Sequence, residues 1–180
     1  MFRKIVSIYK IPLLISITLA IVLLAQGVIR NPIDIISTII GCFMGTFVLD
    51  SEYLLYSYFD PTLEFSKNVV AYINHKDYKS LIDFIETNRY EVKDRSLNSA
   101  LFQAILAPIC IFVAYASTSY FIKAFTLCVF ANSIYRLVEA YFDGKTNDWF
   151  WAMKAKPSKE GIIFYVSALT LILIFCLYII

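Results

Sequence analysis

Two carboxylates, Asp50 and Glu52, lie one residue apart at the point where an apolar stretch of the chain ends. The sequence before them, GCFMGTFVL, carries no charge, and a segment rich in Tyr and Leu follows. Because desolvating a carboxylate costs free energy, both side chains should face water, a cation or a basic partner rather than lipid. These acids are therefore the first candidates for a functional site.

The 180-residue chain is far more apolar than a soluble domain. It is 59% hydrophobic and 17% charged, against about 45–50% and about 25% in soluble domains, and its mean hydropathy is +0.68. We therefore predict an integral membrane protein. The net charge is only +2, and basic residues form no stripe with interleaved aromatic residues, so we expect no nucleic-acid partner.

Five apolar segments are long enough to cross a bilayer as helices, which takes about 20 residues. They cover the ranges 11–29, 33–57, 97–116, 120–141 and 161–180. The sequence thus predicts an all-α fold, with residues 1–180 forming a single membrane domain of about five transmembrane helices. Pro32 fits the first position of the second helix. Gly41 and Gly45 form a Gly-x-x-x-Gly motif in that helix, which predicts close packing against a neighbour.

A polar insertion, residues 60–94, separates the second and third predicted spans. An apolar stripe at helical spacing consists of Tyr78, Leu81, Ile82 and Ile85. This spacing is typical of an amphipathic helix. Asp60 followed by Pro61 is typical of a helix start, with Asp60 as the N-cap. We predict a cytoplasmic insertion of two short amphipathic helices, lying on the inner leaflet or packed under the bundle.

The lysines and arginines are distributed unevenly between the two sides of the predicted bundle. If the N-terminus is cytoplasmic, only Arg30 and Lys123 lie on the opposite side, and Arg136 lies within a helix. Positive residues are enriched in cytoplasmic loops, so we predict a multi-pass cell-membrane protein with a cytoplasmic N-terminus. Trp149 and Trp151 precede several lysines in the last loop, and this pattern predicts an interfacial anchor that contacts membrane lipid.

This topology places three sequence-distant polar clusters on the cytoplasmic face. The clusters are Asp50 with Glu52, Asp94 with Arg95, and Arg136 with Glu139 and Asp143. Carboxylates from separate helices could together hold a hard divalent cation, since Mg²⁺, Mn²⁺ and Ca²⁺ prefer oxygen ligands. In a simpler alternative, one of the first two acids pairs with Arg95 or Arg136 and neutralises charge where the helices meet the interface.

The order of these motifs resembles that of the membrane-bound metal-dependent hydrolases, an inner-membrane family typified by a LexA-regulated bacterial member. The family pattern is a small-residue helix ending in Pro-Asp-x-Asp-His, then His-Arg-x-x-Thr-His-Ser opening the next span, then His-x-x-x-Asp on a later helix. The corresponding sequences here are LDSEY at 49–53, DRSLNSAL at 94–101 and YRLVE at 135–139.

Every histidine of that pattern is replaced in this chain. The replacing residues are Tyr53, Asp94, Ser99 and Tyr135, while Glu52 and Glu139 replace aspartates. The resemblance implies a metal held by Asp50, Glu52, Asp94 and Glu139. It also implies that Glu139 or Asp94 moves a proton, and that Arg95 and Arg136 orient an anionic substrate group. Without imidazole ligands, Mg²⁺ or Mn²⁺ is favoured over Zn²⁺.

Two functions follow from these observations. The first is a metal-dependent hydrolase acting on a lipid or lipid-linked phosphate or ester at the cytoplasmic face, where the metal would lower the pKa of a bound water. The second is a non-catalytic relative that serves as a membrane scaffold and binds a protein partner. In the second case, the same acids and arginines form ion pairs that fix the packing of the helices.

Overall fold

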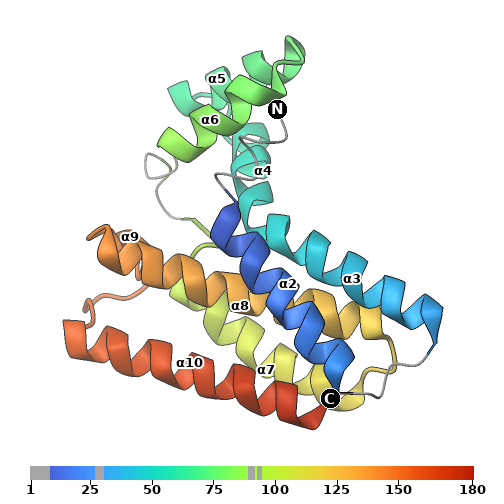
Figure 1. The fold of residues 1–180 in the computed structure, drawn as a ribbon. Helices are drawn as coiled ribbons and strands as arrows, with labels where there is room; N and C mark the ends of the chain where they lie inside the picture. Colours follow the sequence, from blue (N-terminus) through green and yellow to red (C-terminus); the bar gives the residue numbers. More distant parts are fainter. Residues whose placement is uncertain (1–8, 27–30, 89–91, 93–94) are drawn as a thin grey trace.

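The computed structural model describes residues 9–26, 31–88, 92 and 95–180, and every regular element in these ranges is helical. The elements are α2 (Lys10–Ala25), α3 (Pro32–Phe47), the 3₁₀ turn η1 (Val48–Asp50), α4 (Ser51–Phe59), α5 (Glu64–Asn74), α6 (Tyr78–Asn88), α7 (Ala100–Ala116), α8 (Tyr120–Phe142), α9 (Thr146–Trp149) and α10 (Lys159–Ile179) (Figure 1). The all-α prediction is therefore confirmed.

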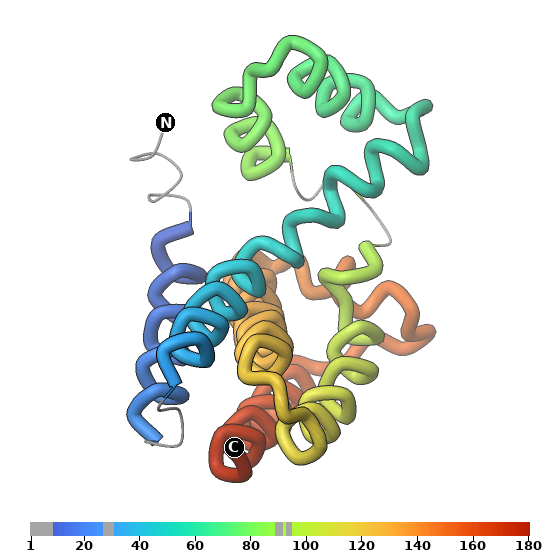
Figure 2. The backbone as a smooth tube through the Cα atoms, turned by 90° about the vertical axis from the view of Figure 1, so that its right-hand side faces the viewer, coloured from blue at the N-terminus to red at the C-terminus, as the bar shows by residue number. Residues whose placement is uncertain are grey.

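Helix α8 is the centre of a bundle that also contains α2, α3, α7 and α10 (Figure 2). Its central turns are buried around most of their circumference, and Leu127, Phe130 and Leu137 are at most 1% exposed. A helix that is buried on all sides has no amphipathic face, because every side of it contacts another element. Small residues mixed with large apolar ones along α8 allow it to be packed on all of its sides.

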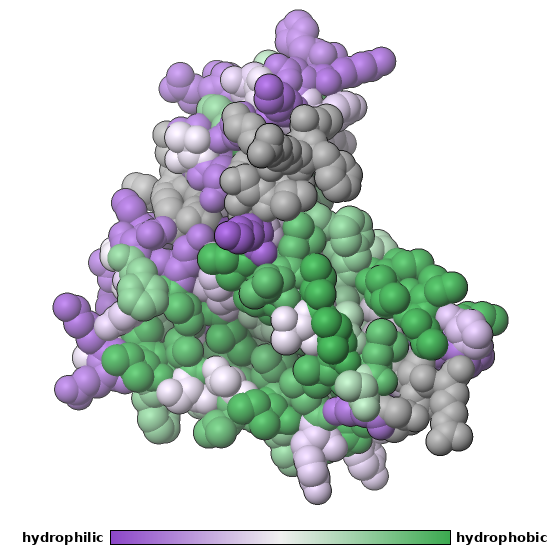
Figure 3. Space-filling model, viewed as in Figure 1, coloured by the Kyte–Doolittle hydropathy of each residue, from purple (hydrophilic) through white to green (hydrophobic). Residues whose placement is uncertain are grey.

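Among the described residues, three helical stretches are long and apolar enough to cross a membrane. They are Pro32–Phe59, Tyr120–Phe142 and Lys159–Ile179. The apolar helices α2 and α7 are shorter, with 16 and 17 residues. Figure 3 shows a broad hydrophobic surface over the bundle and a hydrophilic end where α4 leaves it. Exposed apolar patches of this extent mark interaction surfaces, and the three candidate spans agree with the predicted membrane character.

Local sequence signals set several of the helix ends. Pro32 is the first residue of α3, as predicted, and the Asn31 side chain accepts a hydrogen bond from the main-chain nitrogen of Ile33 at 3.1 Å. Helix α7 begins at Ala100 rather than at residue 97, because the Ser99 hydroxyl caps it. Such caps satisfy main-chain N–H groups that have no partner within the helix.

The two glycines of α3 allow it to lie directly against α8. A Cβ atom at Gly41 would be 2.7 Å from the main-chain oxygen of Phe121, and one at Gly45 would be 2.9 Å from Cys128 Cβ. Both distances are too short for ordinary contacts. The predicted close packing of this helix is thus confirmed, and α8 is the neighbour.

Small polar side chains join α2, α3 and α8 inside the bundle. Ser16 Oγ lies 2.7 Å from Thr46 Oγ1 and 2.9 Å from Cys128 Sγ. Asn132 Nδ2 donates to Ser16 Oγ at 3.1 Å. Interhelical hydrogen bonds of this kind favour association of helices in lipid, where apolar contacts alone provide little preference.

Helix α3 continues through η1 into α4, which leaves the bundle and carries the antiparallel pair α5 and α6 (Figures 1 and 2). We call α5 and α6 the hairpin. Its core is separate from that of the bundle and contains Tyr53, Phe65, Val69, Leu81 and Val92. The two predicted short helices are therefore present. The predicted N-cap at Asp60 is wrong, since α5 begins at Glu64 and Asp60 Oδ1 instead accepts from the Thr62 hydroxyl in a turn.

Candidate functional site

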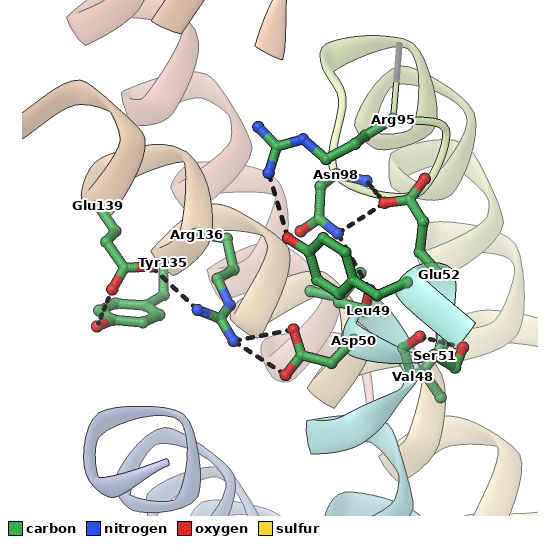
Figure 4. Close-up of polar contacts among 11 residues, drawn as sticks. Val48, Leu49, Asp50, Ser51, Glu52, Arg95, Asn98, Tyr135, Arg136 and Glu139 are labelled. Atoms are coloured by element: carbon green, nitrogen blue, oxygen red, sulfur yellow. Dashed lines mark hydrogen bonds and ion pairs between the residues drawn. The ribbon is translucent and has the colours of Figure 1, made fainter. Parts of the chain in front are cut away.

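Three parts of the chain meet at the hydrophilic end of the bundle: η1 with the start of α4, the segment 95–99 that precedes α7, and the last turns of α8 (Figure 4). The candidate residues predicted from the sequence lie on these three parts. The structure brings most of them together, but in two separate sets of contacts. One set is centred on Arg136 and the other on Glu52.

Arg136 of α8 links two of the predicted acids. Its Nη2 atom donates to both carboxylate oxygens of Asp50 at 3.0 Å, and its Nη1 atom donates to Glu139 Oε2 at 3.1 Å. The Tyr135 hydroxyl donates to the other oxygen of Glu139 at 3.3 Å. The predicted alternative, an ion pair between one of the first acids and an arginine, is confirmed for Asp50 and Arg136.

Tyr9 adds a further donor to Asp50. Its hydroxyl donates a hydrogen bond to the Asp50 carboxylate. Burial raises the pKa of Tyr9 above its ordinary value, and the negative charge of Asp50 together with this hydrogen bond raises it further. The hydroxyl therefore keeps its proton and remains a donor at neutral pH. Asp50 is held from both sides, by α8 and by the residue just before α2.

Glu52 faces a different neighbour, the segment that leads into α7. Its Oε1 atom accepts from the main-chain nitrogen of Leu97 at 2.7 Å, and its Oε2 atom accepts from the main-chain and side-chain nitrogens of Asn98 at 3.1 and 2.8 Å. Glu52 is only 6% exposed. Three N–H donors thus compensate a buried carboxylate that has no charged partner in these contacts.

Arg95 and Tyr53 connect the same two segments once more. Arg95 is 3% exposed, and its Nη1 atom donates to the Tyr53 hydroxyl at 3.3 Å. The Arg95 carbonyl accepts from the indole nitrogen of Trp151 at 2.8 Å. Asn98 Nδ2 also donates to the carbonyl of Leu49 at 3.0 Å. The chain entering the hairpin and the chain leaving it are therefore hydrogen-bonded to each other.

The acids do not present their oxygens to one point. Asp50 and Glu139 both turn toward the guanidinium of Arg136, whereas Glu52 points to Asn98 (Figure 4). Among the described residues, no three His, Cys, Asp or Glu side chains are grouped so that they could hold a metal ion. A divalent cation needs several oxygens directed at one centre. The described acids, as arranged, do not fit such an ion, and the fourth predicted ligand, Asp94, lies outside the described residues.

A small polar cavity and a larger cleft adjoin these contacts. The cavity has a volume of about 10 Å³, enough for roughly one water molecule. It is lined by Tyr53, Arg95, Asn98, Arg136, Glu139, Ala140 and Trp149. The cleft, of about 280 Å³, lies between α6 and the break from α3 to α4. The predicted apolar stripe of α6 contributes Leu81, Ile82 and Ile85 to its wall.

Tyr9 and Asn98 belong to the site but were not predicted from the sequence. Both are uncharged donors in irregular segments, and no spacing rule marks such residues. Trp149 was predicted to anchor the protein at the lipid interface, and this is wrong. It is 2% exposed, and its indole nitrogen donates to Gln103 Oε1 at 3.1 Å.

Comparisons of the chain with protein-family models, with curated proteins and with solved structures gave no match. The resemblance to the membrane-bound metal-dependent hydrolases therefore stays a prediction from three short motifs.

Proposed function

We propose that this protein is a non-catalytic membrane scaffold that crosses the membrane five times and holds the hairpin at the cytoplasmic face for a protein partner. The polar site is then the base on which the hairpin is fixed. One observation carries the proposal. The described acids predicted as metal ligands are each bound by the protein's own donors, and these donors tie both ends of the hairpin to the bundle.

The two hydrogen-bonded sets act on different connections. Arg136 binds Asp50 at η1, where the chain leaves α3. This contact attaches the segment that leads into the hairpin to α8. Glu52 binds the segment 97–98, where the chain returns to α7. Removing either set frees one connection of the hairpin but leaves the other in place. A hairpin that must keep one orientation relative to the bundle needs both sets of contacts.

The topology rests on the helix directions and on the distribution of charge. Helices α2 and α7 are about 24–26 Å long at about 1.5 Å per residue, somewhat less than a hydrocarbon core of about 30 Å, and their partners in the bundle are long enough to span. Among the described lysines and arginines, only Lys123 falls at the end of the bundle opposite the hairpin. By the positive-inside rule, the end that carries the hairpin is cytoplasmic, as is the N-terminus.

The hydrolase interpretation receives less support from this geometry. It needs the carboxylates to bind a cation and the two arginines to receive an anionic group. Asp50 already shares Arg136 with Glu139, and the cavity between Arg95 and Arg136 has a volume of only about 10 Å³. That space suits about one water molecule and is too small for a phosphoryl group.

Metal analysis of the purified protein separates the two functions. The protein is purified in detergent after equilibration with Mg²⁺ and Mn²⁺, and bound metal is measured for the native chain and for Asp50→Asn and Glu52→Gln. The scaffold predicts no stoichiometric metal in any of the three. Stoichiometric Mn²⁺ or Mg²⁺ that is lost in both folded variants would overturn the scaffold and support the hydrolase.

Site-specific crosslinking in membranes tests the role of the hairpin. A photoreactive residue replaces Val70, which is 40% exposed on α5, and a control replaces Tyr115, which is 82% exposed at the end of α7 away from the hairpin. We expect one discrete crosslinked protein from position 70 only, with a lower yield in Arg136→Gln. Crosslinks of equal yield from both positions, or none from position 70, would contradict a docking role.

A further inference from the structure

Two cysteines meet inside the bundle, where α3 packs against α8. Cys42 and Cys128 are 2% and 0% exposed, and their thiols are hydrogen-bonded to each other. Cys128 Sγ also lies 2.9 Å from the main-chain oxygen of Cys42. We propose that these residues are a peroxide-reactive thiol pair, which closes into a disulfide between α3 and α8 when a hydroperoxide oxidises Cys42.

The packing of α3 against α8 brings the two cysteines within reach of a covalent bond. A Cβ atom added at Gly45, three residues after Cys42, would lie 2.9 Å from Cys128 Cβ and 3.2 Å from its sulfur. The glycine therefore leaves the main chain of α3 in contact with Cys128. A disulfide requires two main chains that approach closely and side chains directed toward each other, and the hydrogen bond between the thiols meets the second requirement.

A cleft between α2 and α3 connects Cys42 with the outer surface of the bundle. Its volume is about 90 Å³, and its wall contains Cys42, Ser16 and apolar side chains that include Ile17 and Phe43. Ile17 and Phe43 are 58% and 57% exposed, so the cleft opens outward. Cys128 does not line this cleft. A small oxidant that enters it therefore meets Cys42 first, and Cys128 reacts second.

Oxidation by a hydroperoxide leaves no charge in the apolar interior. The Cys42 sulfur attacks the terminal oxygen of the peroxide, the O–O bond breaks, and the thiol proton moves to the leaving oxygen. The products are a sulfenic acid and an alcohol, or water if the oxidant is hydrogen peroxide. The Cys128 sulfur then attacks the Cys42 sulfur, the S–O bond breaks, and the second thiol proton joins the leaving hydroxyl as water. Two thiols are oxidised and one peroxide is reduced.

Polar neighbours of Cys128 assist the second step. Asn132 Nδ2 donates to Cys128 Sγ at 3.3 Å, and Ser16 Oγ lies 2.9 Å from the same sulfur. Donors next to a sulfur stabilise the negative charge that develops on it as its proton leaves. Ser16 also lines the cleft, so its hydroxyl is placed to pass the Cys128 proton to the leaving hydroxyl. The disulfide would join α8 to the helix that continues into α4 and the hairpin.

Oxidation of the full chain in lipid nanodiscs tests the thiol pair. The probes are hydrogen peroxide and cumene hydroperoxide, and peptide mapping by mass spectrometry after alkylation of free thiols detects the disulfide. We expect a disulfide between Cys42 and Cys128 that dithiothreitol reverses. It should form faster with cumene hydroperoxide, which partitions into lipid. A faster reaction with hydrogen peroxide would support the pair but assign the oxidant to the aqueous phase.

Single variants separate the roles of the two cysteines. Cys128→Ser should stop at the sulfenic acid on Cys42, which dimedone labels, whereas Cys42→Ser should give neither a disulfide nor a dimedone label on Cys128. Cys110→Ser is the matched control, because Cys110 is 0% exposed in the same bundle but does not line the cleft. It should form the disulfide as the native chain does.

Two results would overturn the proposal. One is the absence of a disulfide between Cys42 and Cys128 in the native chain with either peroxide, a result that does not depend on the folding of any variant. The other is dimedone labelling of Cys128 in Cys42→Ser as strong as that of Cys42 in Cys128→Ser, which would mean that access through the cleft does not decide which thiol reacts.

Discussion

The carboxylate of Glu52 accepts hydrogen bonds from both the side-chain and the main-chain nitrogen of Asn98, at 2.8 and 3.1 Å. Both residues are buried, at 6% and 2% exposure. Glu52→Ala leaves three N–H groups without their acceptor, and we expect a loss of roughly 2–4 kcal/mol in the free energy of unfolding. Glu52→Gln should lose less, because its amide oxygen can still accept.

The measurement for Glu52 is unfolding in detergent micelles, with the exposed Glu64 as a comparison. Glu64→Ala on the hairpin should change the free energy of unfolding by about 0.5 kcal/mol or less. Asn98→Ala should resemble Glu52→Ala, and the double variant should cost less than the sum of the two single variants. Additive losses would mean that the two side chains do not interact.

The ion pair between Asp50 and Arg136 predicts which of the two substitutions, at Arg136 or at Asp50, lowers the free energy of unfolding more. Arg136→Gln leaves both Asp50 and Glu139 without their cation, whereas Asp50→Asn leaves Arg136 paired with Glu139. Arg136→Gln should therefore be the more destabilising, by roughly 3–5 kcal/mol. A double-mutant cycle measures the coupling, for which we expect about 0.5–3 kcal/mol. If Asp50→Asn proved the worse of the two, the shared role of Arg136 would be wrong.

Gly45 predicts a steric effect on the packing of α3 against α8. Gly45→Ala places a Cβ 2.9 Å from both Cys128 Cβ and the main-chain oxygen of Phe125, so the helices must separate. We expect a loss of about 1–3 kcal/mol. Gly161→Ala is the matched control, since its Cβ would lie at an ordinary 3.4 Å from Pro157 Cβ. Thermal unfolding of both variants checks this difference, and similar melting would contradict it.

Asp77 predicts a pH effect on the hairpin. The Ser80 hydroxyl and the Ser80 main-chain nitrogen, the latter at 3.2 Å, bond to the Asp77 carboxylate and hold its pKa below the ordinary value of 3.8. A carboxyl whose pKa is lower in the folded state stabilises that state above its unfolded pKa and loses this contribution as the pH falls through the folded value. The start of α6 should thus loosen only below about pH 4.

A titration followed by NMR of the Asp77 carboxyl carbon measures this pKa directly. Ser80→Ala removes the hydroxyl, which makes the largest contribution to the lowered pKa, and should bring the pKa back toward its ordinary value. An unchanged pKa in Ser80→Ala would show that the hydroxyl has no such effect. The partly buried Asp60, whose carboxylate accepts from the Thr62 hydroxyl instead, provides an internal comparison.

Features governed by local rules could be predicted from the sequence. Pro32 opens α3, and the glycines at 41 and 45 mark its contact with α8, because both depend on backbone geometry alone. An ion pair between one of the first two acids and Arg95 or Arg136 was one of two open alternatives, the other being a metal site, and the structure has the pair Asp50–Arg136. Residue types identified these partners as charged groups near one interface, but not which acid would pair with which arginine.

Features that depend on irregular segments could not be predicted. Asn98 lies in the segment before α7, where no periodicity fixes the direction of a side chain, yet it is the main partner of Glu52. From its residue type and its place in the last loop, Trp149 was expected at the membrane interface. In the structure, the polar side chain of Gln103 satisfies its indole nitrogen, and burial becomes favourable.

The contact between Glu52 and Asn98 joins residues that are 46 positions apart in the chain. The polypeptide consequently leaves the spans and rejoins them at nearly the same place. A segment with adjacent ends is a removable module: it can be excised and bridged by a short glycine linker, or exchanged for another small domain, without rethreading the helices in the bilayer. The position of the hairpin is therefore a suitable site for inserting another small domain at the membrane surface.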